Sequence, residues 1–303
     1  MQYPRFLSLL LLAALLGGCP EPGMPSNVHV VSDLVYAQAY VSETPYSPGG
    51  GRQFELHELM ADVYVPDDQP GVAKPAVLVI HGGAFLIGSR ENDNLRAYAA
   101  RIASAGYVCF LIDYRLESDA PPAPGAWGNS TYTAAIHAAA VDANAALRYM
   151  FAQAEIFEID TKRVVALGAS AGAITALNVG MSDPGAFTSD GPGYTVPGGN
   201  NAGQPTELHA IVDLWGSAAF VLEEIDVSDP PVLIVHGKLD ITPAASFADS
   251  LVLERSLEEN GVPFEFYPIP RAGHEPWNAE VGGRDLAEIT LDFLETYLAP
   301  SAG

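Results

Sequence analysis

Five short apolar runs constrain the fold of this chain more than any other feature of its sequence. Runs of this length without alternation are typical of strands that are buried on both faces of a sheet. Other segments repeat apolar residues in steps of three and four, most clearly over residues 136–154 and 245–259, which is the pattern of an amphipathic helix. Strand, helix and strand in succession require parallel crossovers, so the sequence predicts an α/β fold with helices on both faces of a mostly parallel sheet. The runs lie at residues 76–80, 107–112, 164–167, 210–214 and 232–235.

Three further segments extend the predicted sheet to about eight strands. Alternate residues from Leu59 to Val65 are apolar, which favours a half-buried antiparallel or edge strand. A first strand is expected near residues 35–41 and a last one at residues 264–267. We see no internal repeat and no second domain, and the irregular segment 184–205 is too short for a large cap domain. One domain is therefore expected from residue 28 to residue 303.

The balance of charge disfavours anionic partners. The chain has 303 residues, of which 37 are acidic and 14 basic, so its formal net charge is -23. Such a chain repels phosphate backbones and anionic lipid headgroups. We therefore expect no nucleic-acid partner.

The first 18 residues have the pattern of an export signal. Arg5 precedes an apolar run over residues 6–16, which is shorter than the ~20 residues that span a bilayer as a helix. Residues 16–19 resemble a bacterial lipobox, in which the cysteine is acylated and becomes the mature N-terminus. We expect a signal peptide over residues 1–18, lipidation at Cys19 and a disordered tether over residues 19–27, with a buried N-terminal helix as the alternative.

These features predict an exported lipoprotein of the bacterial cell envelope, periplasmic or anchored in the outer membrane. Its contact with a membrane would be made only through the lipid. The other cysteine, Cys109, lies in an apolar run without an obvious partner, so no disulfide is expected.

Ser170 lies in the sequence GASAG, between a predicted buried strand and a predicted helix. In that context G-x-S-x-G favours a sharp turn that holds a serine in a strained backbone with its hydroxyl above the sheet. The glycines are needed there because side chains would collide with the neighbouring strand and helix. Ser170 is therefore a candidate nucleophile, and the alternative is that the glycines only permit a tight crossing.

A serine nucleophile needs a base, and the base needs a carboxylate. His274 lies in the loop after the last predicted strand, and Asp240 lies a few residues beyond the strand at residues 232–235. Helix capping is the alternative role for Asp240. His81 and His236 also follow strands, but each begins an HG turn, which favours orientation of the backbone over proton transfer.

Attack on a carbonyl also needs donors for the oxyanion that forms. The sequence HGGAF, residues 81–85, follows a buried strand, and its glycines let the backbone approach a substrate. We assign the backbone N–H groups of Gly83 and Ala84, together with that of Ala171, to an oxyanion hole. A tight turn or a phosphate loop is the alternative, although no Walker pattern follows.

Four motifs in this order, HGGAF, GASAG, HGKLD and AGH, resemble the alpha/beta-hydrolase superfamily. Within it the chain is similar to bacterial carboxylesterases of the hormone-sensitive-lipase type and to the group that includes feruloyl and acetyl-xylan esterases. The sequences DYRL, residues 113–116, and PPVLIVHGKLD strengthen the match, which covers residues 56–298. Ala84 stands where many relatives have a third glycine, and ESDAPPAPGAW follows DYRL in place of the usual APE, so the loop there is expected to differ.

The resemblance implies a serine ester hydrolase that forms an acyl-enzyme and needs no metal or organic cofactor. A site without a large cap, on a strongly acidic protein, favours short-chain or carbohydrate-linked acyl esters, whether small or attached to a polysaccharide. One alternative is a peptidase of the prolyl-oligopeptidase type, which usually carries a propeller domain for which no residues remain. The other is a non-catalytic binding module. Candidate pocket walls, for which ordinary packing is the alternative, are Phe85, Leu86, Trp215 and Trp277.

Overall fold

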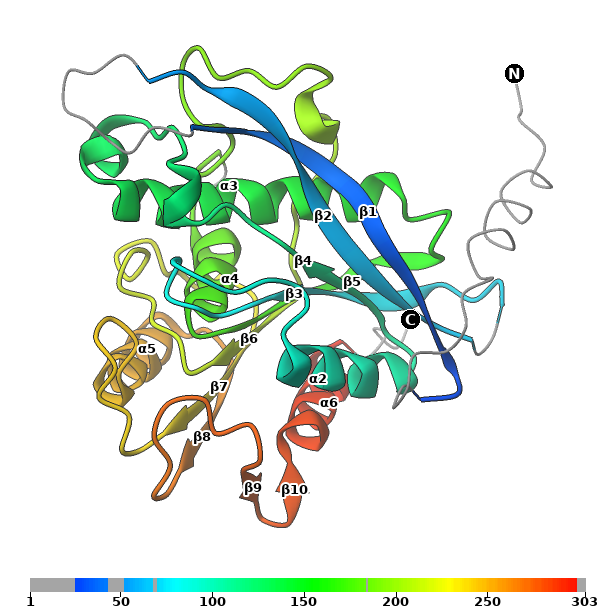
Figure 1. Cartoon of the computed structure of the whole chain (residues 1–303). Coiled ribbons are helices and arrows are strands. Elements are labelled where there is room, and N and C mark those ends of the chain that lie inside the picture. The colour runs from blue at the N-terminus through cyan, green and yellow to red at the C-terminus, as the bar shows by residue number, and fades with distance from the viewer. Residues whose placement is uncertain (1–24, 43–51, 68–69, 184, 299–303) are drawn as a thin grey trace.

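The computed structural model describes residues 25–42, 52–67, 70–183 and 185–298 (Figure 1). Eight strands form one sheet in the order β1-β2-β4-β3-β5-β6-β7-β8. β1, β2 and β4 pair antiparallel, and all other neighbours pair parallel. The strands are β1 (Val28–Val41), β2 (Glu55–Pro66), β3 (Lys74–Ile80), β4 (Val108–Ile112), β5 (Ile159–Ala169), β6 (Ala210–Leu214), β7 (Val232–Gly237) and β8 (Phe264–Ile269). The predicted α/β fold with a mostly parallel sheet is confirmed.

Helices cover both faces of the sheet (Figure 1). One face packs against α3 (Thr131–Ala152), α4 (Ala171–Met181) and α5 (Phe247–Asn260), and the other against α2 (Asp93–Ser104) and α6 (Leu286–Tyr297). Alternate side chains of each central strand feed the two cores: in β3, Leu78 belongs to the first and Val77 to the second, and both are buried. Burial on both faces is what the continuous apolar runs predict.

The first strand begins earlier than the sequence predicts, at Val28 instead of near residue 35. The pairing of β1 with β2 shifts register between Val31 and Leu34, where Asp33 has a φ of 57°. This bulge interrupts the alternation of side chains, which hides the first half of the strand from a search for period two. The structure also adds a small hairpin, β9 (Glu280–Val281) and β10 (Arg284–Asp285), that was not predicted.

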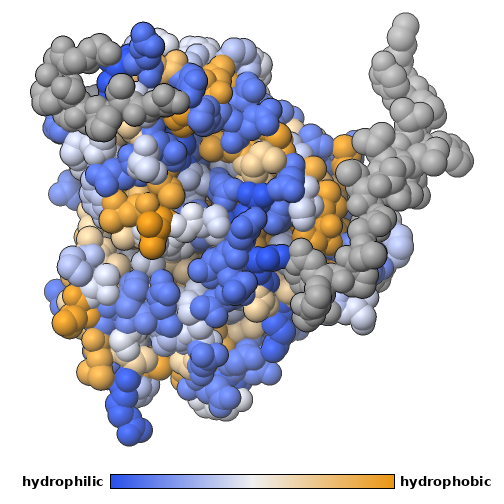
Figure 2. Space-filling model, in the orientation of Figure 1, coloured by the Kyte–Doolittle hydropathy of each residue, from blue (hydrophilic) through white to orange (hydrophobic). Residues whose placement is uncertain are grey.

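The predicted signal peptide, Cys19 and most of the tether lie outside the described residues, so the lipid anchor stays a prediction. Residues 25–27 form a turn that leads into β1. Among the residues that the structure describes, no helix is long and apolar enough to cross a bilayer. Hydrophilic residues cover much of the face shown in Figure 2, with smaller hydrophobic patches between them.

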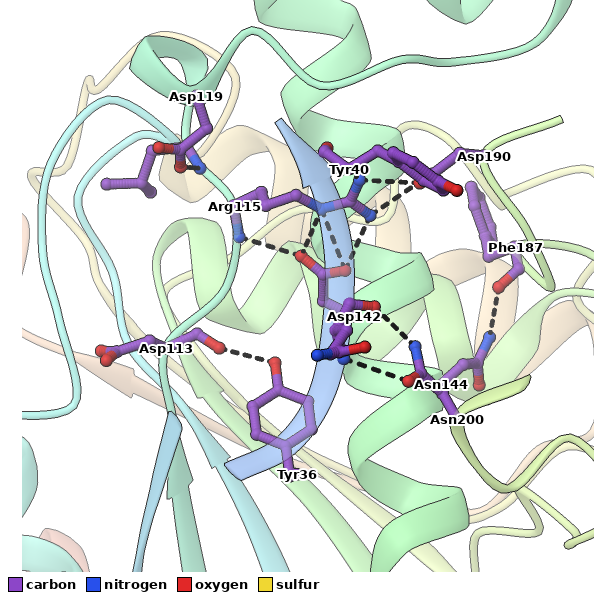
Figure 3. A network of polar contacts seen from close by, with 12 residues as sticks. Tyr36, Tyr40, Asp113, Arg115, Asp119, Asp142, Asn144, Phe187, Asp190 and Asn200 are labelled. Carbon is purple, nitrogen blue, oxygen red and sulfur yellow. Dashed lines mark hydrogen bonds and ion pairs between the residues drawn. The ribbon is translucent and has the colours of Figure 1, made fainter. Parts of the chain in front are cut away.

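The long connection from α4 to β6 packs on the sheet through a buried ion pair (Figure 3). Within its described part the only helical piece is a 3-10 turn, η3 (Gly199–Asn201). Arg115, which follows β4, lies between Asp142 of α3 and Asp190 of the connection, at N–O distances of 2.7 and 2.8 Å. All three side chains are buried. Asn200 exchanges two hydrogen bonds with the backbone of Gln38 in β1, which fixes the far end of the connection.

A buried carboxyl in β6 predicts a pH-dependent stability. Asp213 accepts one hydrogen bond, from the backbone N–H of Gly216, and its other oxygen has no partner among the described residues. Burial raises the pKa of this carboxyl from 3.8 to about 7. The folded state therefore binds a proton that the unfolded state releases, and folding stability falls as the pH rises from about 4 to about 7.

We expect the Asp213→Asn variant to lose this dependence. Its free energy of unfolding relative to wild type should rise by roughly 4 kcal/mol between pH 4 and pH 8, because the amide cannot ionise. Urea unfolding at several pH values measures the difference, with the exposed Glu207→Gln as control. A constant difference between Asp213→Asn and wild type over this range contradicts the prediction.

Candidate active site

Ser170 lies between β5 and α4, at the edge of the sheet where the parallel strands end. Its backbone has a φ of 55° and a ψ of -117°, a conformation that is costly for a residue with a side chain. Its N–H donates to the carbonyl of Leu214 at the end of β6, at 2.8 Å, which holds the turn in place. The strained turn predicted from GASAG is confirmed.

The two glycines of this motif are required by close approach of the backbone. A Cβ on Gly172 would overlap the carbonyl of Ile80 in β3, and one on Gly168 would overlap the backbone of Gly172. Neither position can accept a side chain without a shift of the strand or helix. The tight crossing and the presentation of Ser170 are therefore two aspects of one arrangement.

His274 and Asp240 join Ser170 in a chain of hydrogen bonds. The Nε2 atom of His274 lies 2.8 Å from Ser170 Oγ, and its Nδ1 atom lies 2.5 Å from Asp240 Oδ2. The backbone N–H of Thr242 donates to the other oxygen of Asp240, at 2.9 Å. Burial works against the charge of Asp240, but the hydrogen bonds from His274 and Thr242 outweigh it and hold the pKa of the carboxyl below its usual value. Three residues separated by up to 104 positions in sequence are thus brought together.

His236 is part of the same cluster, which sequence reasoning missed. We expected it to orient backbone, but its ring contacts side chains: Nε2 lies 2.9 Å from Asp240 Oδ2, and Nδ1 lies 2.5 Å from the hydroxyl of Ser250 in α5. Burial lowers its pKa more than the hydrogen bond with Asp240 raises it. The spacing of four residues between His236 and Asp240 after a strand was the available signal. His81 does contact the backbone as expected, with Nδ1 2.7 Å from the carbonyl oxygen of Gly82.

The HGGAF loop lies directly against the serine. A Cβ on Gly82 would come within 3.2 Å of Ser170 Cβ, and the loop is closed by two N–H groups, of Leu86 and Ile87, that donate to the carbonyl of Gly83. The N–H groups of Gly83 and Ala84 donate no hydrogen bond to any described residue. Ala171 begins α4, so its N–H has no partner within the helix. The three predicted oxyanion donors are thus available to a ligand.

The four predicted pocket walls differ in their exposure to solvent. Phe85 and Trp215 are 1% and 0% exposed, so as placed they offer no surface to a substrate, and the prediction is not supported for either. Phe85 packs against the rings of Tyr114 and Tyr132, and Trp215 packs edge-on against Trp277. An apolar residue just beyond a strand can turn into the core or outward, and sequence does not distinguish the two.

Leu86 and Trp277 have different surroundings. Leu86 is 45% exposed and stays a candidate wall, together with its neighbour Ile87, which is 70% exposed. Trp277 lines a cavity of about 420 Å³ between α2 and α6, and none of Ser170, Asp240 and His274 lines that cavity. Its most direct role is packing against Tyr98 and Trp215.

One group of described residues has ligand atoms close enough to share a metal ion. The atoms of His236, Asp240 and His274 lie within 4.8 Å of one another. They already face one another as hydrogen-bond donors and acceptors, with both imidazole rings on a single carboxylate oxygen. We therefore interpret the group as a proton-handling network.

The sequence of the chain is similar to those of known proteins. The model of the BD-FAE family matches residues 61–224. Esterase LipC of Mycobacterium tuberculosis is 24% identical over 259 residues, which cover 71% of this chain and 56% of LipC. Ethyl acetate hydrolase of Pseudomonas putida is 32% identical over 117 residues, which cover 38% of this chain and 32% of that protein. The match thus spans about half or less of the length of these curated relatives.

Several solved structures have a fold similar to that of this chain. A thermophilic esterase of Thermogutta terrifontis superposes with a TM-score of 0.65 at 20% identity, over 95% of this chain and 99% of its own. A carbohydrate esterase from gut microbiota gives a TM-score of 0.62 at 18% identity, over 93% of this chain and 100% of its own. The Thermogutta esterase has also been solved phosphorylated by paraoxon. At these identities the comparison establishes the fold.

Proposed function

Because the chain belongs to the BD-FAE family and has an alpha/beta-hydrolase fold, we propose that it is a serine hydrolase of carboxylic esters. The observation that carries this proposal is the chain of hydrogen bonds from Ser170 Oγ through His274 to Asp240, at 2.8 and 2.5 Å. A nucleophile, a base and a carboxylate in this order are what acyl transfer to serine requires.

The proposed reaction proceeds through an acyl-enzyme. Ser170 Oγ attacks the ester carbonyl while His274 Nε2 takes its proton, and Asp240 stabilises the resulting imidazolium. The tetrahedral anion binds the N–H groups of Gly83, Ala84 and Ala171. When it collapses, the alcohol leaves with the proton from His274. Water then attacks the acyl-enzyme through the same steps and releases the acid and free Ser170.

We propose short-chain or carbohydrate-linked acyl esters as the substrate class. The described connection from α4 to β6 contains one 3-10 turn and is tied to the sheet, so it does not form a large cap over the site. An open site suits an ester attached to a bulky or polymeric alcohol. A formal net charge of -23 disfavours anionic substrates. The names of two relatives, ethyl acetate hydrolase and carbohydrate esterase, are consistent with this class.

A panel of substrates tests the proposal. We expect turnover of p-nitrophenyl acetate and butyrate and of acetylated or feruloylated sugars, with kcat/KM at least ~10-fold lower for a decanoate ester, because pocket contacts discriminate by about this much per group. A Pro-linked chromogenic peptide is the control for the peptidase alternative. Cleavage of that peptide without hydrolysis of any ester would overturn the proposal.

A further inference from the structure

We propose that His236, held by Ser250, is a positioning residue of the site. Its ring fixes the carboxylate of Asp240, whose negative charge is then shared between the rings of His236 and His274. This inference rests on the proposed function, because it concerns the base of that reaction. Its basis is geometric: Oδ2 of Asp240 faces two imidazole nitrogens, His274 Nδ1 at 2.5 Å and His236 Nε2 at 2.9 Å.

The surroundings of His236 determine its tautomer. An ionised carboxylate only accepts hydrogen bonds, so Nε2 of His236 carries the proton that it shares with Asp240. Burial lowers the pKa of the ring, which keeps it neutral, and Nδ1 then accepts the hydroxyl proton of Ser250 at 2.5 Å. Ser250 is 1% exposed, and its place in α5 fixes the ring from a separate element.

Few charges compete for this ring. The titratable groups that face it are Asp240, from the loop after β7, and His274, from the loop after β8. From α5 it meets the uncharged hydroxyl of Ser250 and the ring of Phe247, at a centroid distance of 6.1 Å. The backbone carbonyl of Ala245, just before α5, also faces the ring and opposes the effect of burial on its pKa. His236 therefore acts on the site mainly through its hydrogen bond with Asp240.

A purely structural role would explain less. The four preceding residues of β7, Val232 to Val235, are apolar and 0% exposed, and His236 is also 0% exposed. An imidazole in such a place costs folding free energy unless both nitrogens are satisfied. Here both are satisfied, and one is used on the oxygen that also contacts the proposed base.

Removal of the His236 donor has two expected consequences. Asp240 Oδ2 loses one of its two imidazole contacts, so the carboxylate is held less rigidly and the orientation of His274 suffers. The negative charge of Asp240 is then shared with one imidazole ring instead of two. Both effects reach the reaction through the base and leave the binding of substrate nearly unchanged.

The experiment compares four variants in the full-length protein with p-nitrophenyl acetate from pH 5 to pH 9. His236→Leu removes the donor, and His236→Asn retains polarity with an amide that is too short to reach Oδ2. His236→Gln restores a donor at the position of Nε2. Ser250→Ala removes the partner that holds the ring.

For His236→Leu and His236→Asn we expect kcat lower by about 10- to 100-fold, the range known for residues that orient reactive groups. KM should stay within about twofold, so the loss should appear in kcat and not in substrate binding. His236→Gln should recover most of kcat, and Ser250→Ala should show a smaller loss in the same direction.

The inference is overturned if folded His236→Leu or His236→Asn keeps the wild-type kcat while wild type hydrolyses the ester, or if KM rises as much as kcat falls. Should His236→Leu fail to fold, as judged by circular dichroism, the Asn, Gln and Ser250→Ala variants decide in the same way. Wild type without any esterase activity would instead overturn the proposed function and this inference with it.

Discussion

Replacement of Ser170 by alanine should lower kcat for ester hydrolysis by on the order of 10⁴-fold or more, because it removes the proposed nucleophile. KM should change only a few-fold, since the donors of Gly83, Ala84 and Ala171 remain. Alanine keeps the Cβ of serine, so the turn at a φ of 55° is retained and the fold is unaffected. Labelling by a fluorescent fluorophosphonate should disappear with the activity.

Ser217→Ala is a matched control for this variant. Ser217 is also a buried serine and lies just beyond β6, but within the described part of the chain its hydroxyl accepts a hydrogen bond only from the N–H of Ala219. It should retain both labelling and turnover. If Ser170→Ala is still labelled, another nucleophile performs the reaction. If wild type is not labelled at all, the fold serves as a non-catalytic binding module.

Replacement of Arg115 by methionine should destabilise the protein by about 3–5 kcal/mol, the usual cost of removing one partner from a buried ion pair. Asp142 and Asp190 would remain in the core without a cation, and the carbonyl of Tyr40, now 3.0 Å from the guanidinium, would lose its donor. Urea unfolding followed by circular dichroism measures the loss.

The sign of its pH dependence follows from Asp142. Burial raises the pKa of this carboxyl, and the charge and hydrogen bonds of Arg115 oppose that rise. Without Arg115 the folded state holds a proton on Asp142 to higher pH, so the variant should be least stable at alkaline pH and should recover part of the loss as the pH falls.

Two further variants serve as controls for Arg115→Met. Arg284→Met breaks a pair with Asp292 whose side chains are 40% and 54% exposed, so it should cost far less stability than Arg115→Met. The triple variant Arg115→Met, Asp142→Asn and Asp190→Asn removes all three charges and should regain much of the stability that the single variant loses. Equal effects of Arg115→Met and Arg284→Met would contradict the role of burial.

Sequence was sufficient for the sheet because burial on both faces leaves a local mark. Each of the five apolar runs lies in one of the strands β3 to β7. Ser170, Asp240 and His274 could be found for a related reason: each lies in the segment that follows a strand, and the carboxyl ends of parallel strands meet at one edge. Local pattern and overall topology gave the same answer at these positions.

Contacts between distant segments leave no such mark. Nothing in the residues around Asp190 indicates that it meets Arg115, 75 positions away. The direction of the His236 ring depends on the path of the loop that returns Asp240 and on the placement of α5. Phe85 and Trp215 are buried and do not present the surface predicted for pocket walls. Packing decides to which side a residue turns after a strand, and sequence does not show it.

The position of His274 late in the chain has a consequence for folding. β8 is one of the two edge strands of the sheet and the last of its eight strands in sequence, and His274 follows it. Because a domain generally folds as a unit, His274 reaches Ser170 only when β8 takes its place at the edge of the sheet. Ester hydrolysis would then begin only after β8 has docked, so a measurement of activity would indicate that the sheet is complete. A partly folded chain would have no activity.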